Sequence, residues 1–105
     1  MRVATYFLNH RRFLELAGER GGHRGELQVR LDGTDARERL TVRVERAAAT
    51  DPERLREVFL AGYPELRSAV TEEGLLDLVV EAVDGASLDR SPTSGKLLAV
   101  VDARR

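Results

Sequence analysis

The chain of 105 residues has no cysteine and no tryptophan, and only 5% of its residues are aromatic. The absence of cysteine excludes disulfide bonds, thiolate metal sites and a cysteine nucleophile, so stability must come from packing. The longest apolar run, residues 97–101, is far shorter than the roughly 20 residues that cross a bilayer, and residues 3–8 are too short for a signal peptide. We therefore expect one domain over residues 1–105, a cytoplasmic location and no membrane partner.

Charge is nearly balanced, with 17 Lys and Arg residues against 18 Asp and Glu residues. Arginine is in excess in the first half and acid in the second, which could steer an anionic ligand; we favour the simpler interpretation that mixed surface charge maintains solubility. Lys96 is the only lysine, and every other basic residue is arginine. An ammonium is a compact point charge, whereas a guanidinium is a planar fork, so Lys96 is the first residue that we single out.

The first half predicts a strand, a helix and a hairpin. Residues 3–8 are rich in β-branched and aromatic side chains, which favour a strand, and Asn9 is placed to cap a helix over residues 10–17. Phe13, Leu14 and Ala17 have the spacing of its inner face. Residues 26–31 and 40–46 alternate apolar and polar side chains, so they predict a hairpin. Its buried face should hold Leu27, Val29, Leu31, Leu40, Val42 and Val44.

The second half predicts two helices and two strands. Thr50, Pro52 and Glu53 form a capping box that begins a helix, Gly62 is placed to end it, and a shorter helix follows from Pro64 to about residue 70. Residues 76–83 read as a strand, and residues 97–101 as a short terminal one. This order predicts an α+β, ferredoxin-like (βαββαβ) fold, in which an antiparallel sheet carries its helices on one face and has an added C-terminal strand.

Several kinds of site have no support in the sequence. His10 and His23 lack a second ligand at helical spacing, so we expect no metal site. Neither a phosphate-binding loop nor the Gly-x-Ser-x-Gly nucleophile motif of hydrolases occurs. The two hairpin segments carry no aromatic residue that would stack on RNA, so we expect no nucleic-acid partner. The glycine-rich residues 18–25 could bind an anion through backbone amides, but we interpret them as a connector.

The C-terminal segment, residues 87–104, resembles the end of the phenylacetate-CoA ligase family of AMP-forming, adenylate-forming enzymes. That family ends with a Gly-Ser-Leu segment, a short Arg-Ser or Arg-Thr loop, a Gly-Lys pair and Arg-Val-Ile-Asp-x-Arg. The resemblance is specific over residues 86–104 and looser over the rest of the chain. The matching positions are Leu88, Arg90, Ser91, Gly95, Lys96, Val100, Val101, Asp102 and Arg104.

The resemblance implies that the chain is a C-terminal lid domain, freestanding or excised, which is not active alone. In such enzymes a large N-terminal adenylation domain binds ATP and a carboxylate, and the lid presents a lysine to the reacting oxygens. Lys96 would be that catalytic residue, and Arg90, Ser91, Ser94 and Gly95 would form its substrate loop. The lid alone would bind no cofactor; ATP with Mg²⁺, and CoA, would enter only with the partner domain, in cis or in trans.

A second hypothesis from another class remains open. The chain could be a non-catalytic, ferredoxin-like interaction module that binds a protein partner or forms a homo-oligomer through its sheet. A lid requires an exposed Lys96 loop, whereas an interaction module requires an exposed apolar patch or an unprotected strand edge.

Overall fold

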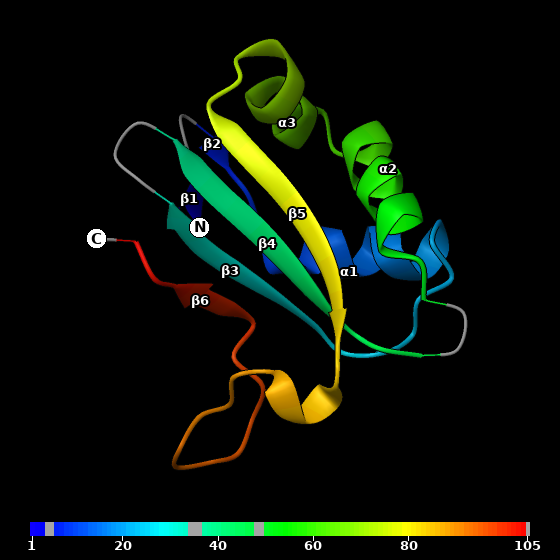
Figure 1. Cartoon of the computed structure of the whole chain (residues 1–105), viewed down its shortest axis with the longest axis vertical. Coiled ribbons are helices and arrows are strands. Elements are labelled where there is room, and N and C mark those ends of the chain that lie inside the picture. The colour runs from blue at the N-terminus through cyan, green and yellow to red at the C-terminus, as the bar shows by residue number, and fades with distance from the viewer. Residues whose placement is uncertain (4–5, 34–36, 48–49, 105) are drawn as a thin grey trace.

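The computed structural model describes residues 1–3, 6–33, 37–47 and 50–104, and it has an α+β architecture (Figure 1). Among these residues, three α-helices accompany a two-stranded and a four-stranded sheet. A π-helical turn, Ser68–Glu72, continues the third helix, and a 3-10 turn, Gly85–Ser87, follows the fifth strand. The elements are β1 (Arg2–Val3), β2 (Tyr6–Phe7), α1 (His10–Glu19), β3 (Leu27–Gly33), β4 (Glu38–Glu45), α2 (Pro52–Gly62), α3 (Pro64–Arg67), β5 (Leu76–Val83) and β6 (Val100–Asp102).

The larger sheet has the strand order β5-β4-β3-β6. Strands β3 and β4 pair antiparallel from Leu27 opposite Val44 to Gly33 opposite Glu38, which confirms the predicted hairpin. Strand β5 runs parallel to β4, and β6 runs parallel to β3. The prediction of an all-antiparallel sheet is therefore wrong. The helices between β4 and β5 return the chain to the starting end of β4, so β5 must run in the same direction as β4.

The predicted strand over residues 3–8 does not join this sheet. It is divided into β1 and β2, which pair with each other, and the Leu8 amide donates to the Met1 carbonyl at 2.8 Å. Residues 4–5 of the predicted strand lie outside the described residues. Strand β6 occupies the edge of β3 instead, where the Val29 amide donates to the Ala99 carbonyl at 3.0 Å. That edge of β3 is therefore not open to the N-terminal segment.

The apolar core lies between one face of the four-stranded sheet and the helices. All six side chains predicted for the inner face of the hairpin are buried. The Phe13 ring of α1 meets the Phe59 ring of α2 edge to face, with centroids 5.3 Å apart, and it lies 5.3 Å from the Tyr63 ring. Leu14, predicted to face inward, is 41% exposed, and Leu16 is buried in its place. The inner stripe of α1 is thus Phe13, Leu16 and Ala17, which keeps the helical spacing.

Helix α2 begins one residue later than the predicted cap. Asp51 is its N-cap and accepts a hydrogen bond from the Arg54 amide at 3.3 Å, while the Thr50 hydroxyl accepts from the Ala47 amide at 2.9 Å. The helix ends at Gly62, as predicted. A Cβ at Gly62 would lie 2.5 Å from Leu16 Cδ2, so the missing side chain allows α1 and α2 to pack closely.

The opposite face of the sheet is charged. Arg39 forms a bidentate pair with Asp32 at 2.8 and 3.0 Å, and Arg43 lies 3.3 Å from Glu81 on the neighbouring strand. Opposite charges side by side on adjacent strands stabilise a face that is open to water. Within the described ranges, none of the helices has the length and apolar character needed to cross a membrane.

Candidate functional site: the Lys96 hairpin loop

The residues singled out from the sequence lie together in a hairpin loop, residues 89–98, which we call the Lys96 loop. Arg90 and Leu97 form an antiparallel bridge, the Ser91 amide donates to the Lys96 carbonyl at 2.8 Å, and the Leu98 amide donates to the Asp89 carbonyl at 3.0 Å. Figure 1 shows the loop, in orange, projecting beyond the end of the sheet and away from the helices. The loop is thus a hydrogen-bonded projection with a defined base and tip.

The tip is organised around Ser91. Its carbonyl accepts from the Gly95 amide at 2.9 Å, and its hydroxyl oxygen lies 3.1 Å from the Thr93 hydroxyl and 3.4 Å from the Ser94 amide. Gly95 has a φ of +73°, a left-handed conformation that glycine adopts without the steric cost of a Cβ. The structure therefore places the predicted loop residues Ser91, Ser94 and Gly95 in one turn, directly before Lys96.

The backbone of Lys96 is fixed by hydrogen bonds, whereas its charged side chain is exposed. Its carbonyl accepts from the Ser91 amide, and its own amide lies 3.4 Å from the Ser94 hydroxyl oxygen. The side chain is exposed, and in the described part of the chain its ammonium group has no hydrogen-bond or ion-pair partner. A surface charge that is not neutralised within its own domain remains available to a negatively charged group outside it.

Arg90 is paired, in contrast to Lys96. One of its terminal nitrogens donates to Glu26 Oε1 at 2.6 Å, and the other lies 3.5 Å from the Gly95 carbonyl. The ion pair connects the rising side of the Lys96 loop to the residue before β3. Both side chains are 38% exposed, so solvent screens the pair and its contribution to stability is small. The position of Arg90 beside Gly95 also supports the turn that precedes Lys96.

The sequence analysis missed the residue that holds the base of the loop. Gln28 is fully buried; its Nε2 donates to the carbonyls of Asp89 and Leu98, both at 2.8 Å, and its Oε1 accepts from the Asp89 amide at 3.2 Å. One side chain on β3 therefore binds both sides of the hairpin. Gln28 stands at a polar position of the alternating segment, and the alternation alone indicated a solvent-facing residue.

Arg43 supports the same base from the neighbouring strand. Its guanidinium donates to the Ser87 carbonyl at 2.9 Å and to Gln28 Oε1 at 3.2 Å, and it lies 3.4 Å from a carboxylate oxygen of Asp89. The guanidinium is mostly covered, with a side-chain exposure of 15%. Hydrogen bonds to charged donors in such a partly dry position are stronger than those at the open surface. Gln28, Arg43 and Asp89 together form what we call the loop clamp.

Neither histidine contributes to a metal centre in the described ranges, where no group of three or more His, Cys, Asp or Glu residues could hold an ion. His10 Nε2 lies 2.6 Å from the Leu27 carbonyl, and His23 Nε2 lies 3.5 Å from the Glu26 carbonyl. Comparisons of the chain with protein-family models, with curated proteins and with solved structures found no match.

Proposed function

We propose that the chain is a lid domain of the phenylacetate-CoA ligase type, and that Lys96 contacts the reacting oxygens when a partner adenylation domain activates a carboxylate. The observation that carries this proposal is the exposed ammonium of Lys96, without a partner among the described residues, on a loop whose base is fixed by Gln28. The expected ferredoxin-like arrangement enters the same proposal only as an order of elements: α1, β3, β4, α2 and β5 follow one another as expected, while the parallel pairing of β5 with β4 departs from it.

The chemistry needs one positive charge at a fixed place. As a carboxylate oxygen attacks the α-phosphate of ATP, negative charge develops on the bridging and phosphoryl oxygens while pyrophosphate leaves. A preorganised cation at that position stabilises the transition state more than the ground state. A clamped base and a defined turn limit the positions that Lys96 can take, and its long side chain reaches outward from them. ATP with Mg²⁺, the carboxylate and CoA would be bound by the partner domain.

A chimaeric enzyme tests this proposal. The chain is fused to the adenylation domain of a phenylacetate-CoA ligase from which the native lid has been removed, and acyl-adenylate formation is followed by pyrophosphate release. We expect Lys96→Ala to lower this rate by about 10²–10³-fold, the loss typical of removing one transition-state contact. Lys96→Arg should not restore the rate, because the planar guanidinium does not replace a compact ammonium. Thioester formation from a preformed adenylate should change far less.

Arg67→Ala is the matched control, because Arg67 is another exposed cation without a side-chain partner in the described residues. It should leave adenylation unchanged. Equal rates for wild type, Lys96→Ala and Lys96→Arg would contradict the proposal and make Lys96 an ordinary surface residue. A fall in thermal midpoint that matches the loss of rate would instead assign Lys96 a structural role.

The interaction-module hypothesis is favoured by one separate observation. Strand β5, eight residues long, lies at one edge of the four-stranded sheet, and within the described residues no strand pairs with its outer side. Free backbone groups along such an edge can pair with another strand. Sedimentation over a range of concentrations tests self-association: a reversible dimer would support the module, and a monomer throughout would contradict pairing between copies of this chain.

A further inference from the structure

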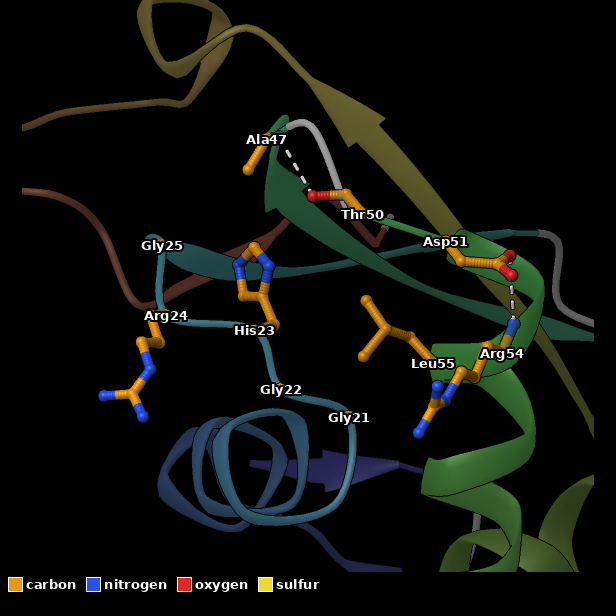
Figure 2. Close-up of a pocket in the computed structure, with 10 residues that line it drawn as sticks. All are labelled: Gly21, Gly22, His23, Arg24, Gly25, Ala47, Thr50, Asp51, Arg54 and Leu55. Atoms are coloured by element: carbon orange, nitrogen blue, oxygen red, sulfur yellow. Dashed lines mark hydrogen bonds between the residues drawn. The ribbon is translucent and has the colours of Figure 1, made fainter.

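A cavity lies between the end of α1 and the start of α2, apart from the Lys96 loop. Its volume is about 340 Å³ (Figure 2). One wall is the glycine-rich segment after α1, and the other is formed by the residues that lead into α2 and by its first turn. The lining residues are Gly21, Gly22, His23, Arg24, Gly25, Ala47, Thr50, Asp51, Arg54 and Leu55. No residue of the Lys96 loop is among them, so this cavity is independent of the proposed lid function.

A buried histidine nitrogen faces this cavity. His23 is only 7% exposed, and its Nε2 lies beside Gly25, 3.2 Å from the place a Cβ on Gly25 would take. Nδ1 is on the other side of the ring and has no hydrogen-bond partner in the described part of the chain. His23 is one of the residues that line the cavity. Figure 2 shows the ring standing between Gly25 and the Thr50 side.

Two arginines and several backbone amides line the cavity that this nitrogen faces. Neither Arg24 nor Arg54 has a side-chain hydrogen bond or ion pair within the described ranges, although most arginines of the chain do. Figure 2 shows the Arg54 side chain extending toward the Gly21 side of the cavity, while Arg24 lies at the outer rim. The amides of Gly22, Arg24 and Gly25 likewise have no backbone acceptor among the described residues. These groups all favour an anion.

One acidic residue lines the cavity, and its carboxylate is already engaged. Asp51 Oδ1 accepts from the Arg54 amide at 3.3 Å as the N-cap of α2. The carboxylate of Glu45 is not among the lining residues, but it lies beside Gly25, with Oε1 2.8 Å from the place a Cβ on Gly25 would take. An anion would therefore bind on the Nδ1 side of His23, away from both carboxylates. Among the lining residues, the guanidinium groups of Arg24 and Arg54 outnumber the Asp51 carboxylate, so the lining itself carries a net positive charge when His23 is neutral.

We propose that this cavity binds the phosphate group of a small molecule, with Arg54 and the free amides holding phosphate oxygens and His23 Nδ1 contacting a further one. Phosphate fits this set because it carries several acceptor oxygens and, near neutral pH, also an O–H group. The guanidinium can donate two parallel hydrogen bonds, and Nδ1 can accept from the O–H or donate to an oxygen according to its own protonation. The volume exceeds that of a phosphate ion, leaving room for a small organic group.

The test uses the full chain labelled with ¹⁵N and titrated at constant ionic strength with inorganic phosphate and, separately, with glycerol phosphate. Saturable shifts of the Gly22, Arg24 and Gly25 amides and of the His23 ring are expected, and tighter binding of glycerol phosphate would identify a phosphomonoester as the better ligand. Tighter binding of inorganic phosphate would identify the free ion. Absence of saturable shifts with both probes would overturn the proposal. This titration uses the wild-type chain, so its outcome does not depend on the folding of a variant.

Two arginine variants supply the matched comparison. Arg54→Gln removes a guanidinium that has no partner in the described part of the protein, so the fold should remain, as the amide spectrum will show. It should raise the Kd for phosphate by about tenfold or more, the effect of losing a hydrogen bond to a charged group. Arg67→Gln, on α3, should leave the Kd unchanged. An unchanged Kd in Arg54→Gln, or an equal change in both variants, would refute a built phosphate site.

Discussion

The side chain of Gln28 binds both backbone polar groups of Asp89: Nε2 donates to the Asp89 carbonyl at 2.8 Å, and Oε1 accepts from the Asp89 amide at 3.2 Å. The same Nε2 reaches the Leu98 carbonyl, on the returning side of the loop. A primary amide offers two donor hydrogens and an acceptor oxygen, and all of them are used here. One buried side chain thus connects both sides of the base of the Lys96 loop to β3.

We predict that Gln28→Leu destabilises the fold by about 2–3 kcal/mol. Leucine is similar in volume, but it leaves the Leu98 carbonyl without the Gln28 donor and the Asp89 amide without its acceptor, while the Asp89 carbonyl keeps only its bond from the Leu98 amide. Buried unpaired groups are costly. Urea unfolding measures the loss. Amide exchange at Leu98 should accelerate as well, since that amide closes the base of the loop.

Thr41→Val is the matched control, because Thr41 is also buried on the polar side of the same sheet and has no side-chain hydrogen bond among the described residues. We expect it to change the free energy of unfolding by less than about 0.5 kcal/mol. A loss in Gln28→Leu no greater than that of the control would show that the loop is held by other contacts.

Gly95 gives a prediction about the tip alone. Its φ of +73° places an alanine at this position in a left-handed conformation, which costs about 1–2 kcal/mol, although no atom would clash with the new Cβ. Because the tip is exposed, we expect Gly95→Ala to loosen the turn rather than unfold the domain. Hydrogen exchange should accelerate at residue 95 and at Ser91, while the thermal midpoint changes little. Gly95→Asn, which tolerates this conformation better, should have a smaller effect.

Local patterns predicted the parts of the fold that depend on neighbouring residues. The alternation in β3 and β4 predicted their pairing and inner face because side-chain direction follows strand geometry. Gly62 predicted the end of α2, and Asn9 predicted the N-cap of α1. The Asn9 side chain accepts a hydrogen bond from the Arg12 amide at 2.8 Å. These features require only a short segment and its immediate hydrogen bonds.

The missed features depend on contacts between distant segments. The parallel pairing of β6 with β3 joins residues about seventy positions apart, as the Val29 and Val100 register shows, and no local pattern specifies it. Gln28 is likewise a polar residue at a position where the alternation indicates a solvent-facing side chain. Only the folded chain places the Asp89 backbone within hydrogen-bond distance of it. For the candidate site, the sequence indicated Lys96 and its turn. It did not indicate the loop clamp or the burial of His23.

The aromatic contact between α1 and α2 leads to a prediction about the core. Phe59 is fully buried and meets Phe13 edge to face at 5.3 Å, so Phe59→Ala should destabilise the fold by about 3–5 kcal/mol. That is a large part of the 5–15 kcal/mol typical of a small domain. The neighbouring Val58, only partly buried, offers the comparison: Val58→Ala should cost much less. Urea unfolding measures both variants. Similar losses of unfolding free energy in Phe59→Ala and Val58→Ala would show that the Phe59 ring is not a major contributor to core stability.

Asp102 and Arg104 give a prediction for acid pH. Hydrogen bonds from the Arg104 side chain, at 2.6 and 2.9 Å, and from its amide, at 3.1 Å, lower the pKa of Asp102 to about 2. The ordinary pKa of an aspartate is about 4. Since folding favours the ionised form, its stabilising effect is complete above about pH 4 and is lost as the pH falls through about 2. Arg104 also donates to the Arg2 carbonyl at 2.6 Å, connecting the two ends of the chain.

We therefore expect Asp102→Asn to be less stable than wild type at pH 7 and the difference to vanish as the pH approaches 2. The side chain of Asp102 is 49% exposed, so screening by water limits the difference to less than about 1 kcal/mol. Urea midpoints measured from pH 7 to pH 2 give the two curves. Glu57→Gln is the control for removing one negative charge, since Glu57 is exposed and makes no ion pair in the described residues. A deficit in Asp102→Asn that stays constant with pH would mean that Asp102 acts through its shape and not through its charge.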